Sequence, residues 1–304
     1  MSRHRLLQRY LRPGLSAAVI VLLLYFILRD DASRFASPDQ SALLTRNRTY
    51  PRSPITVVTA YYYLPSRHAY SEYLAWMDNF LNHIPCHLYI FTHHTMLDII
   101  VSKRRSFLRD RTRFIVRELE ELEEYSNMTV YQKLRDNENR DTAHSAENYV
   151  IWNQKWRFVL EAMEENVFQS EYFLWVDIGS FRDRSLLYPQ RSFPSIDSVQ
   201  SLAPKDKLTL LLVYPFVANA SDWWEDITAD HVGAGIAGGY PHAWRQWIEK
   251  YYETQRVLLT RGVNAGKEQN VMNAVARRYP ETVHLVTPQP YFGDRWFYLQ
   301  YYFA

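Results

Sequence analysis

The chain has 304 residues, enough for one large domain or two small ones, and its 47% hydrophobic content with few Gly and Pro residues excludes disordered and collagen-like proteins. The formal net charge is +2, but residues 1–34 alone carry +4, which leaves −2 for the remainder. The folded part therefore has no basic field for nucleic acid, and we expect no nucleic-acid partner.

The N-terminus has the pattern of a membrane anchor. A basic segment over residues 1–14 precedes an apolar run over residues 15–28, which a charged stretch ends. The run is short and overlaps the length of a signal-peptide core. No small-x-small cleavage site follows directly, however, and flanking arginines can extend the span by snorkelling. We therefore predict an uncleaved transmembrane signal-anchor after a cytoplasmic tail; a cleaved signal peptide and a chance apolar helix are the alternatives.

Basic residues stay on the cytoplasmic side of a membrane, so the rest of the chain is predicted to face the lumen. This describes a single-pass type II membrane protein of the Golgi or endoplasmic reticulum. Residues 29–54 lack apolar periodicity and are rich in Ser, Arg, Asp and Pro, as expected of a stem. The lumenal domain is then expected over residues 55–304. Three N-glycosylation sequons, each weak alone, agree with this address: Asn47, Asn127 and Asn219.

The single cysteine, Cys86, excludes an intrachain disulfide, so the domain must rely on its core. Cys86 lies in an apolar run with no charged activator assigned to it. We predict a small core residue rather than a nucleophile.

From Ile55 onward, short β-branched or apolar runs alternate with segments of helical spacing. Strands are predicted at residues 55–60, 87–92, 113–116, 172–176, 208–214 and 283–286. Helices are predicted at residues 70–81, 96–109, 148–166, 242–259 and 269–279, with an acidic, solvated turn at 118–124 and a polar, mobile loop at 131–146. Alternation of this kind is typical of an α/β domain with a largely parallel sheet.

Ligands bind beyond the carboxyl ends of the strands in such sheets. Three candidate segments follow strands: one covers Ala60 to Tyr63, one runs from Asp177 to Asp183, and a glycine-rich loop covers residues 231–239. We expect them to converge on one face. Tyr61 to Tyr63 could stack on a base or sugar, but in a chain with 23 Tyr ordinary packing is the better explanation.

These segments carry a resemblance. Tyr172 to Asp177 looks like the hydrophobic strand that ends in a metal-bearing aspartate in the glycosyltransferase A fold. The order and spacing of several motifs resemble the HtrL/YibB-like (WlaTC-like) glycosyltransferase family over roughly residues 55–290. They are Thr56–Tyr62, the helix with Trp152, Asn153, Lys155 and Trp156, the Trp175–Arg182 stretch, Gly235–Gly239 and Gly266–Asn273.

The resemblance implies a single nucleotide-diphospho-sugar transferase-like domain of glycosyltransferase A type. It implies an enzyme that moves a sugar from a nucleotide-sugar donor to a glycan or glycoconjugate acceptor. The implied catalytic residues are Asp177, Glu268 and Arg182. The implied donor-binding residues are Thr59, Tyr61, Lys155 and Asp177, and the implied acceptor-binding residues are His231, Gly235, Gly238, Gly239 and Gln269.

Sugar transfer requires neutralisation of a departing diphosphate, which a carboxylate-held Mn²⁺ or Mg²⁺ provides. Asp177 is the predicted metal ligand, with Asp183 assisting through water. A strict Asp-x-Asp would place an acid at position 179, where this chain has Gly. If metal binding is weak or absent for that reason, Arg182 or Lys155 would neutralise the phosphate directly.

Each of these residues also has a structural explanation. Asp177 could cap the following turn, Arg182 could pair with Asp183 at the surface, and Lys155 could snorkel over neighbouring aromatic rings. Glu268 would favour a helix N-terminus through the helix dipole, and His231 is more often an exposed loop histidine than a ligand. A non-catalytic lumenal protein that binds sugars or organises enzymes is therefore the alternative function.

Overall fold

The computed structural model describes residues 43–44, 48–66, 68–138, 144–184, 193–217, 222–290 and 293–304. The predicted anchor and the sequons at Asn47 and Asn219 lie outside these residues. Within the described part of the chain, no helix has the length and apolar character needed to cross a membrane.

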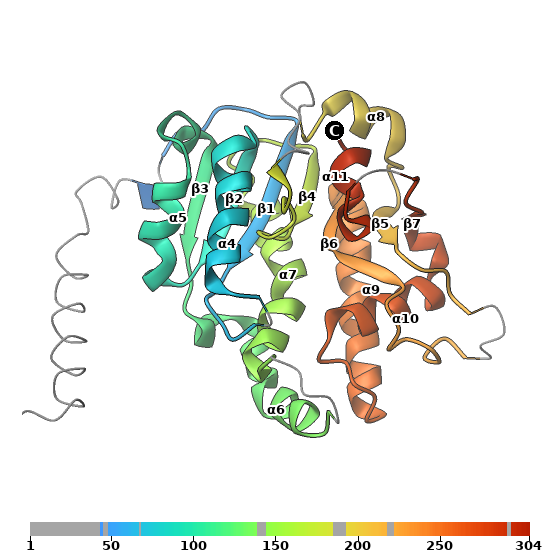
Figure 1. Ribbon diagram of the computed structural model, residues 1–304. Coiled ribbons are helices and arrows are strands. Elements are labelled where there is room, and N and C mark those ends of the chain that lie inside the picture. Colours follow the sequence, from blue (N-terminus) through green and yellow to red (C-terminus); the bar gives the residue numbers. More distant parts are fainter. Residues whose placement is uncertain are drawn as a thin grey trace, which may run out of the picture. The chain divides into compact units, whose positions relative to one another are not determined.

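The described residues contain one sheet of seven strands: β1 (Ile55–Tyr61), β2 (His87–Thr92), β3 (Thr112–Val116), β4 (Tyr172–Val176), β5 (Leu208–Leu212), β6 (Val232–Gly239) and β7 (Val283–Val286). Their order is β3-β2-β1-β4-β6-β5-β7 (Figure 1). Neighbouring strands are parallel except at β6, which runs antiparallel to β4 and β5. The predicted α/β class with a mostly parallel sheet is confirmed.

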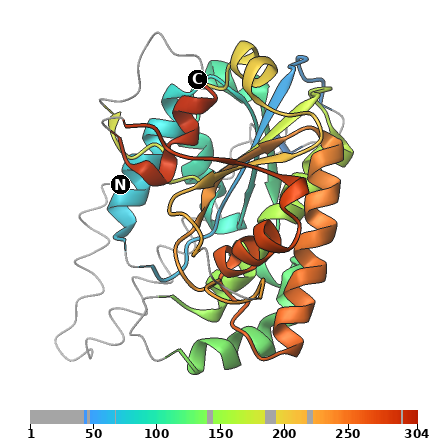
Figure 2. The same ribbon diagram turned by 90° about the vertical axis from the view of Figure 1, so that its right-hand side faces the viewer.

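Helices cover both faces of this sheet. Those of the described residues are α4 (Tyr70–Met77), α5 (Leu97–Lys103), α6 (Met128–Asp136), α7 (Ala146–Glu165), α8 (Ile196–Leu202), α9 (Pro241–Thr260), α10 (Glu268–Arg278) and α11 (Leu299–Tyr302). Helix α7 packs against β1 and β4, while α9 and α10 pack against β6 and against α7. Figure 2 shows α9 on one side of the sheet and α4 with α11 on the other.

An aromatic cluster fixes α7 on the sheet. The Trp156 ring is fully buried and lies 6.5 Å from Trp175 of β4, 5.9 Å from Trp244 and 6.0 Å from Trp247, both on α9, measured between centroids. Replacing so large a buried ring with Ala typically costs about 3–5 kcal/mol. This packing sets the position of every other side chain on α7, including Lys155.

The predicted glycine-rich loop is wrong, because residues 232–239 form strand β6. Close packing against neighbouring side chains explains the glycines of this strand. A Cβ on Gly238 would lie 2.6 Å from Leu174 Cδ2, and one on Gly239 would lie 2.9 Å from Leu208 Cδ1. Only glycine lets the neighbouring side chains approach the backbone this closely, so the pattern that looked like a loop marks a crowded central strand.

The predicted polar loop at 131–146 is also wrong in part, because α6 extends over Met128–Asp136 and α7 already begins at Ala146. Tyr131 gives α6 its anchor: its ring is fully buried and its hydroxyl donates a 2.6 Å hydrogen bond to Glu124. Glu120, Glu121 and Glu123 are exposed, as expected of a solvated acidic turn, but Glu124 is an exception at 1% exposed. Helices α8 and α11 were not predicted.

Cys86 is 3% exposed, as predicted for a core residue, and burial raises the pKa of its thiol. Beside it, the buried Arg104 guanidinium donates to the carbonyls of Leu81, Ile84 and Cys86 and to Thr112 Oγ1. These bonds also explain why the predicted helix at 96–109 ends early. After Lys103 the chain turns Arg104 inward, and a 3₁₀ helix follows at Ser106–Arg111.

Candidate functional site

The sheet has a switch point between β1 and β4. The chain runs from β1 to β2 to β3 on one side, then returns to place β4 on the other side of β1. Loops at such a point leave in opposite directions, which opens a crevice at the carboxyl ends of the two strands.

A pocket lies at the carboxyl ends of β1 and β4. Its lining comes from the segment after β1 (Ala60, Tyr61, Tyr62, Leu64, Ser66), from α4 (Tyr73, Trp76), from α7 (Asn148, Ile151, Trp152, Lys155), from β4 and its loop (Trp175, Asp177, Ile178, Gly179, Arg182), and from Phe297.

One wall of the pocket is aromatic. The Tyr61 ring lies 5.7 Å from Tyr73, which lies 5.2 Å from Trp76. The Arg182 guanidinium carbon lies 4.5 Å from the Trp76 ring and 4.7 Å from the Phe297 ring, so the planar cation is held between two aromatic faces. Stacking of this kind orients a guanidinium. Arg182 Nε also donates to the carbonyl of Gly179 at 3.3 Å, and Nη1 lies 3.9 Å from Asp294 Oδ2.

At the base of the pocket, the Lys155 ammonium joins two carboxylates. Its Nζ lies 2.9 Å from Asp177 Oδ1, 3.2 Å from Asp177 Oδ2 and 3.0 Å from Glu268 Oε1. It also donates to the carbonyl of Ala234 at 3.3 Å. The Lys155 side chain is 4% exposed and that of Glu268 9%, whereas that of Asp177 is 35% exposed. Asp177 is therefore the end of the cluster that meets solvent.

Local structure holds Asp177 on its other sides. Trp175 Nε1 donates to Asp177 Oδ1 at 2.7 Å, and the Asp177 N–H donates to Gly235 O of β6 at 2.7 Å. Because Trp175 and Asp177 are two residues apart, both side chains leave the strand on the α7 side of the sheet. Gly235 has a reason of its own to be glycine, since a Cβ there would lie 2.8 Å from the Phe297 ring.

Glu268 is delivered by a loop pressed against α7. The Asn153 side-chain amide donates to the carbonyl of Gly266 at 2.8 Å, and a Cβ on Gly266 would lie 2.4 Å from the Tyr149 ring. Glycine is thus required for this close approach. Two residues later Glu268 opens α10, where its charge also favours the helix dipole.

Charge pairing controls the ionisation of this cluster. Burial lowers the pKa of Lys155, but the adjacent carboxylates of Asp177 and Glu268 outweigh burial, and the pKa of Lys155 is raised above its ordinary value. The lysine therefore stays an ammonium. Burial also raises the pKa of Tyr61, with a smaller contribution from neighbouring tyrosines, so its phenol stays a neutral hydrogen-bonding group.

The structure brings together five of the residues singled out from the sequence: Tyr61, Lys155, Asp177 and Arg182 line the pocket, and Glu268 supports Lys155 from behind. Glu268 itself does not line the pocket and reaches it only through Lys155, which also donates to the carbonyl of Ala234. Its predicted catalytic role stays a prediction.

Other singled-out residues lie apart from the pocket lining. Thr59 is fully buried within β1, and Gly238 and Gly239 are buried in β6. The Gln269 amide donates to Val232 O at 3.2 Å and fastens α10 to the sheet. Asp183 is exposed. The roles predicted for these residues stay predictions.

The expectation that His231 is an exposed loop histidine is wrong, because it is 4% exposed. Its Nε2 lies 2.8 Å from Asp226 Oδ2, its Nδ1 lies 3.3 Å from Tyr214 O, and its ring centroid lies 4.6 Å from that of Phe216. These contacts tie the segment before β6 together. His231 does not line the pocket.

Sequence reasoning assigned no binding role to several lining residues, among them Tyr73, Trp76, Trp152 and Phe297. Tyr73 and Trp76 fit the helical spacing of a core face, so nothing in that pattern separated a pocket wall from ordinary packing. Trp152 had a signal, since it lies three residues before Lys155 and such positions share a helix face.

The residues around Asp177 suit an ammonium better than a divalent ion. Mg²⁺ and Mn²⁺ favour several oxygen ligands, including carboxylates. Among the described residues that line the pocket, Asp177 is the single carboxylate, and Lys155 lies on both of its oxygens. The positive charge beside Asp177 is thus supplied by Lys155. Metal binding by Asp177 and Asp183 stays an untested prediction that this geometry does not favour.

Comparison with known proteins supports the resemblance found in the sequence. A comparison with curated proteins gave no match. The profile described as "Bacterial protein of unknown function (HtrL_YibB)" matches residues 55–304, which include every strand of the sheet and every residue of the pocket. The chain therefore belongs to the HtrL_YibB family.

Proposed function

We propose that this protein is a glycosyltransferase of glycosyltransferase A type, which moves a sugar from a nucleotide-diphospho-sugar to a hydroxyl group of a glycan or glycoconjugate. The observation that carries the proposal is the pocket at the switch point, where a buried lysine holds an accessible carboxylate opposite an aromatic-stacked arginine. In sugar transfer, the arginine would bind the diphosphate of the donor and the carboxylate would bind the acceptor hydroxyl.

The donor would be held at the aromatic wall. Tyr61, Tyr73 and Trp76 line the pocket and would provide aromatic contacts to a base or sugar. Arg182 presents a fixed cation beside them, and a guanidinium can bind phosphate oxygens in a bidentate manner. Negative charge grows on the diphosphate as its bond to the sugar breaks, so Arg182 would stabilise the transition state more than the ground state.

The acceptor would be engaged at Asp177. This carboxylate is the exposed end of the Lys155 cluster, so it can accept a hydrogen bond from an acceptor hydroxyl. As the hydroxyl oxygen attacks the anomeric carbon, its proton passes to Asp177, and the bond between that carbon and the diphosphate oxygen breaks. General-base assistance of this kind is worth roughly 10²–10⁴ in rate. Lys155 keeps the carboxylate in place, and Glu268 positions Lys155.

Binding of nucleotide sugars to the full-length chain tests this proposal. A thermal-shift screen should find a donor that raises the melting temperature, because a ligand selective for the native state stabilises it. Arg182→Gln should weaken binding of that donor by at least about tenfold, as expected for loss of a charge-assisted phosphate contact. Arg184→Gln is the matched control, since Arg184 is exposed and lies outside the pocket lining.

Three outcomes distinguish a transferase, a non-catalytic sugar-binding protein and a wrong assignment of the pocket. Release of the nucleoside diphosphate by the wild-type chain, together with the loss in Arg182→Gln, supports a transferase. Binding without turnover, over a range of acceptors, supports a non-catalytic sugar-binding protein of the same fold. Absence of binding for every nucleotide sugar, or equal binding in both Arg variants, contradicts the assignment of this pocket.

We also propose a type II orientation, with residues 15–28 as the anchor and the folded part in the lumen of the Golgi or endoplasmic reticulum. The basic flank before that apolar run supports this direction. Expression in secretory cells followed by endoglycosidase treatment should shift the protein on a gel. A membrane-bound chain fully digested by protease from the cytosolic side would contradict the orientation.

A further inference from the structure

A second cluster of chemically reactive side chains lies at the carboxyl edge of the sheet, away from the pocket. His93 and His94 directly follow β2, and Glu118 follows β3 by two residues. The two strands are parallel neighbours whose last residues, Thr92 and Val116, are partners in register. The Arg117 N–H donates to Thr92 O at 3.0 Å and continues the ladder beyond the strands. The sheet therefore delivers these side chains next to each other.

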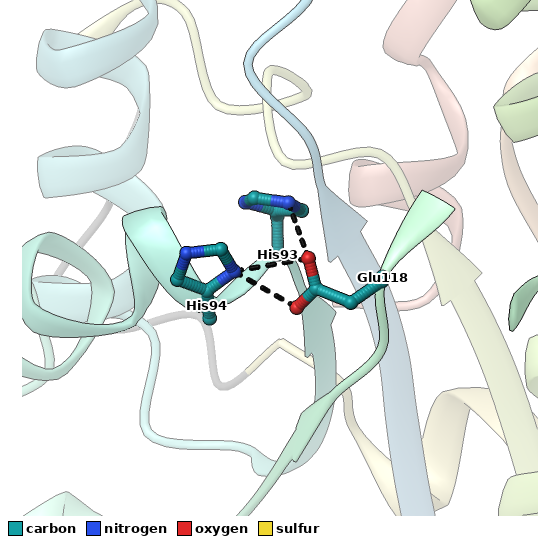
Figure 3. Close-up of side chains that lie close together, drawn as sticks. All are labelled: His93, His94 and Glu118. Carbon is teal, nitrogen blue, oxygen red and sulfur yellow. Dashed lines mark hydrogen bonds and ion pairs between the residues drawn. The ribbon is translucent and has the colours of Figure 1, made fainter. Parts of the chain in front are cut away.

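The three side chains converge on one point (Figure 3). His93 Nε2 lies 2.5 Å from Glu118 Oε2, and His94 Nδ1 lies 2.9 Å from both Glu118 oxygens. One ligand atom from each residue lies within 4.8 Å of the others. Side-chain exposures of 29% for His93, 64% for His94 and 35% for Glu118 leave the cluster open to solvent.

The backbone that carries these side chains is held by its own hydrogen bonds. Glu118 begins a short 3₁₀ helix (Leu119–Glu121) as its capping residue, and its N–H donates to Glu121 Oε2 at 2.8 Å. His93 precedes a second 3₁₀ helix (His94–Met96) and accepts from the Thr95 N–H through Nδ1 at 3.3 Å. Ligands on fixed backbone lose little freedom when an ion binds.

Thr95 supplies the outer partner that a metal-binding histidine requires. A histidine that ligates through one ring nitrogen almost always donates its other N–H to a neighbouring acceptor. His93 Nδ1 lies 2.8 Å from Thr95 Oγ1, which can accept from Nδ1–H while Nε2 faces Glu118. In the other tautomer Nδ1 accepts from Thr95 and Nε2–H donates to Glu118. A cation bound at Nε2 requires the first tautomer, in which Nδ1–H donates to Thr95 Oγ1 and no longer accepts from the Thr95 N–H.

We propose that His93, His94 and Glu118 form a Zn²⁺ site, with water in the fourth position. Two imidazole nitrogens and one carboxylate oxygen are an established ligand set for Zn²⁺, and three protein ligands leave one coordination position open. The site is separate from the sugar-transfer proposal, because it uses β2 and β3 rather than β4 and none of its ligands lines the pocket at Asp177.

Equilibrium dialysis of the tag-free, full-length chain against Zn²⁺ tests the site. The wild-type chain should retain Zn²⁺ at micromolar concentration, and Co²⁺ in its place should give the visible absorption of a four-coordinate, nitrogen-ligated ion. The double variant His93→Gln/His94→Gln should lose more than about 100-fold in affinity, beyond the loss typical of an outer-shell change. Glu118→Gln, which keeps the size of the side chain, should also weaken Zn²⁺ binding.

The controls separate this cluster from other places where Zn²⁺ could bind. His68→Gln removes a histidine that also pairs with a glutamate, Glu72 at 3.7 Å, and should leave affinity unchanged. Asp177→Asn should likewise retain Zn²⁺. The proposal is overturned if the wild-type chain takes up no Zn²⁺, or if the metal-free double variant melts like wild type and still binds it as tightly. Loss of binding in Asp177→Asn alone would assign the ion to the pocket instead.

Discussion

Helix α7 carries two buried polar clusters, and only one of them ends in the pocket. On one side, Lys155 bridges Asp177 and Glu268. On the other, Glu124 accepts from Tyr131 at 2.6 Å and from Arg157 Nε at 3.2 Å. Both clusters remove charge from water and both provide partners within hydrogen-bond distance, which is what burial of a charge demands.

The two clusters differ in where they end. The Glu124 side chain is 2% exposed, and further hydrogen bonds from Gln255 and Asn127 complete its partners inside the protein. The Lys155 cluster instead ends at Asp177, whose side chain is 35% exposed in a pocket. A closed network holds elements together, whereas an open one can also exchange a hydrogen bond with a ligand. Asn127, a predicted glycosylation site, belongs to the closed cluster.

Lys155→Met should cause the largest loss of stability. It leaves Asp177 and Glu268 without the cation between them, and removal of one partner from a buried ion pair typically costs about 3–5 kcal/mol. Urea unfolding of the variant and of wild type measures this difference. A variant within about 1 kcal/mol of wild type would mean that solvent, rather than Lys155, compensates the two carboxylates.

Glu124→Gln should cause a smaller loss, about 1–3 kcal/mol, because buried donors lose a charged acceptor but keep a neutral one. The expected signature is lower stability with unchanged affinity for the nucleotide sugar that the wild-type chain binds. Binding isotherms beside urea unfolding measure both quantities. Weakened binding at unchanged stability would contradict the closed character of this cluster.

Glu268→Gln separates two accounts of that residue. As the support of Lys155 it should lower turnover strongly, because Lys155 then leans toward the one remaining carboxylate, with a melting temperature close to wild type. As a helix-dipole residue alone it would cost about 0.3–1 kcal/mol of stability and little activity. Turnover and thermal melting of the same preparation distinguish them. A variant that melts earlier and turns over normally would favour the dipole account.

Asp177→Asn should have the smallest effect on stability and a large one on activity. The amide keeps the shape of the carboxylate, and the side chain is partly solvated, so thermal stability should be nearly unchanged. Turnover should fall by at least about 10²-fold, the loss typical of removing a general base or a strong electrostatic group. Full activity in the variant would show that Asp177 only organises the loop after β4.

The sequence alone determined much of the fold because its strands are short, apolar and β-branched or aromatic. The predicted strands at 87–92, 172–176 and 283–286 coincide with β2, β4 and β7. Position after a strand also identified Asp177, since the carboxyl end of a parallel strand is where polar residues meet a ligand. A resemblance carried by the order of motifs over 55–290 identified the family.

Tertiary structure alone decided the rest. Gly238 and Gly239 lie in a strand, and they are glycine because Leu174 and Leu208 occupy the space that side chains would need. No local sequence pattern predicts that crowding. Glu124 is buried because Tyr131 and Arg157 reach it from α6 and α7.

Lys155, Asp177 and Glu268 lie far apart in the sequence, and their contact depends on the register of α7 against β4 and α10. Residue type and spacing indicated which side chains carry charge. Which charges share one buried site depends on long-range packing, because a hydrogen bond needs its two atoms within about 3 Å of each other.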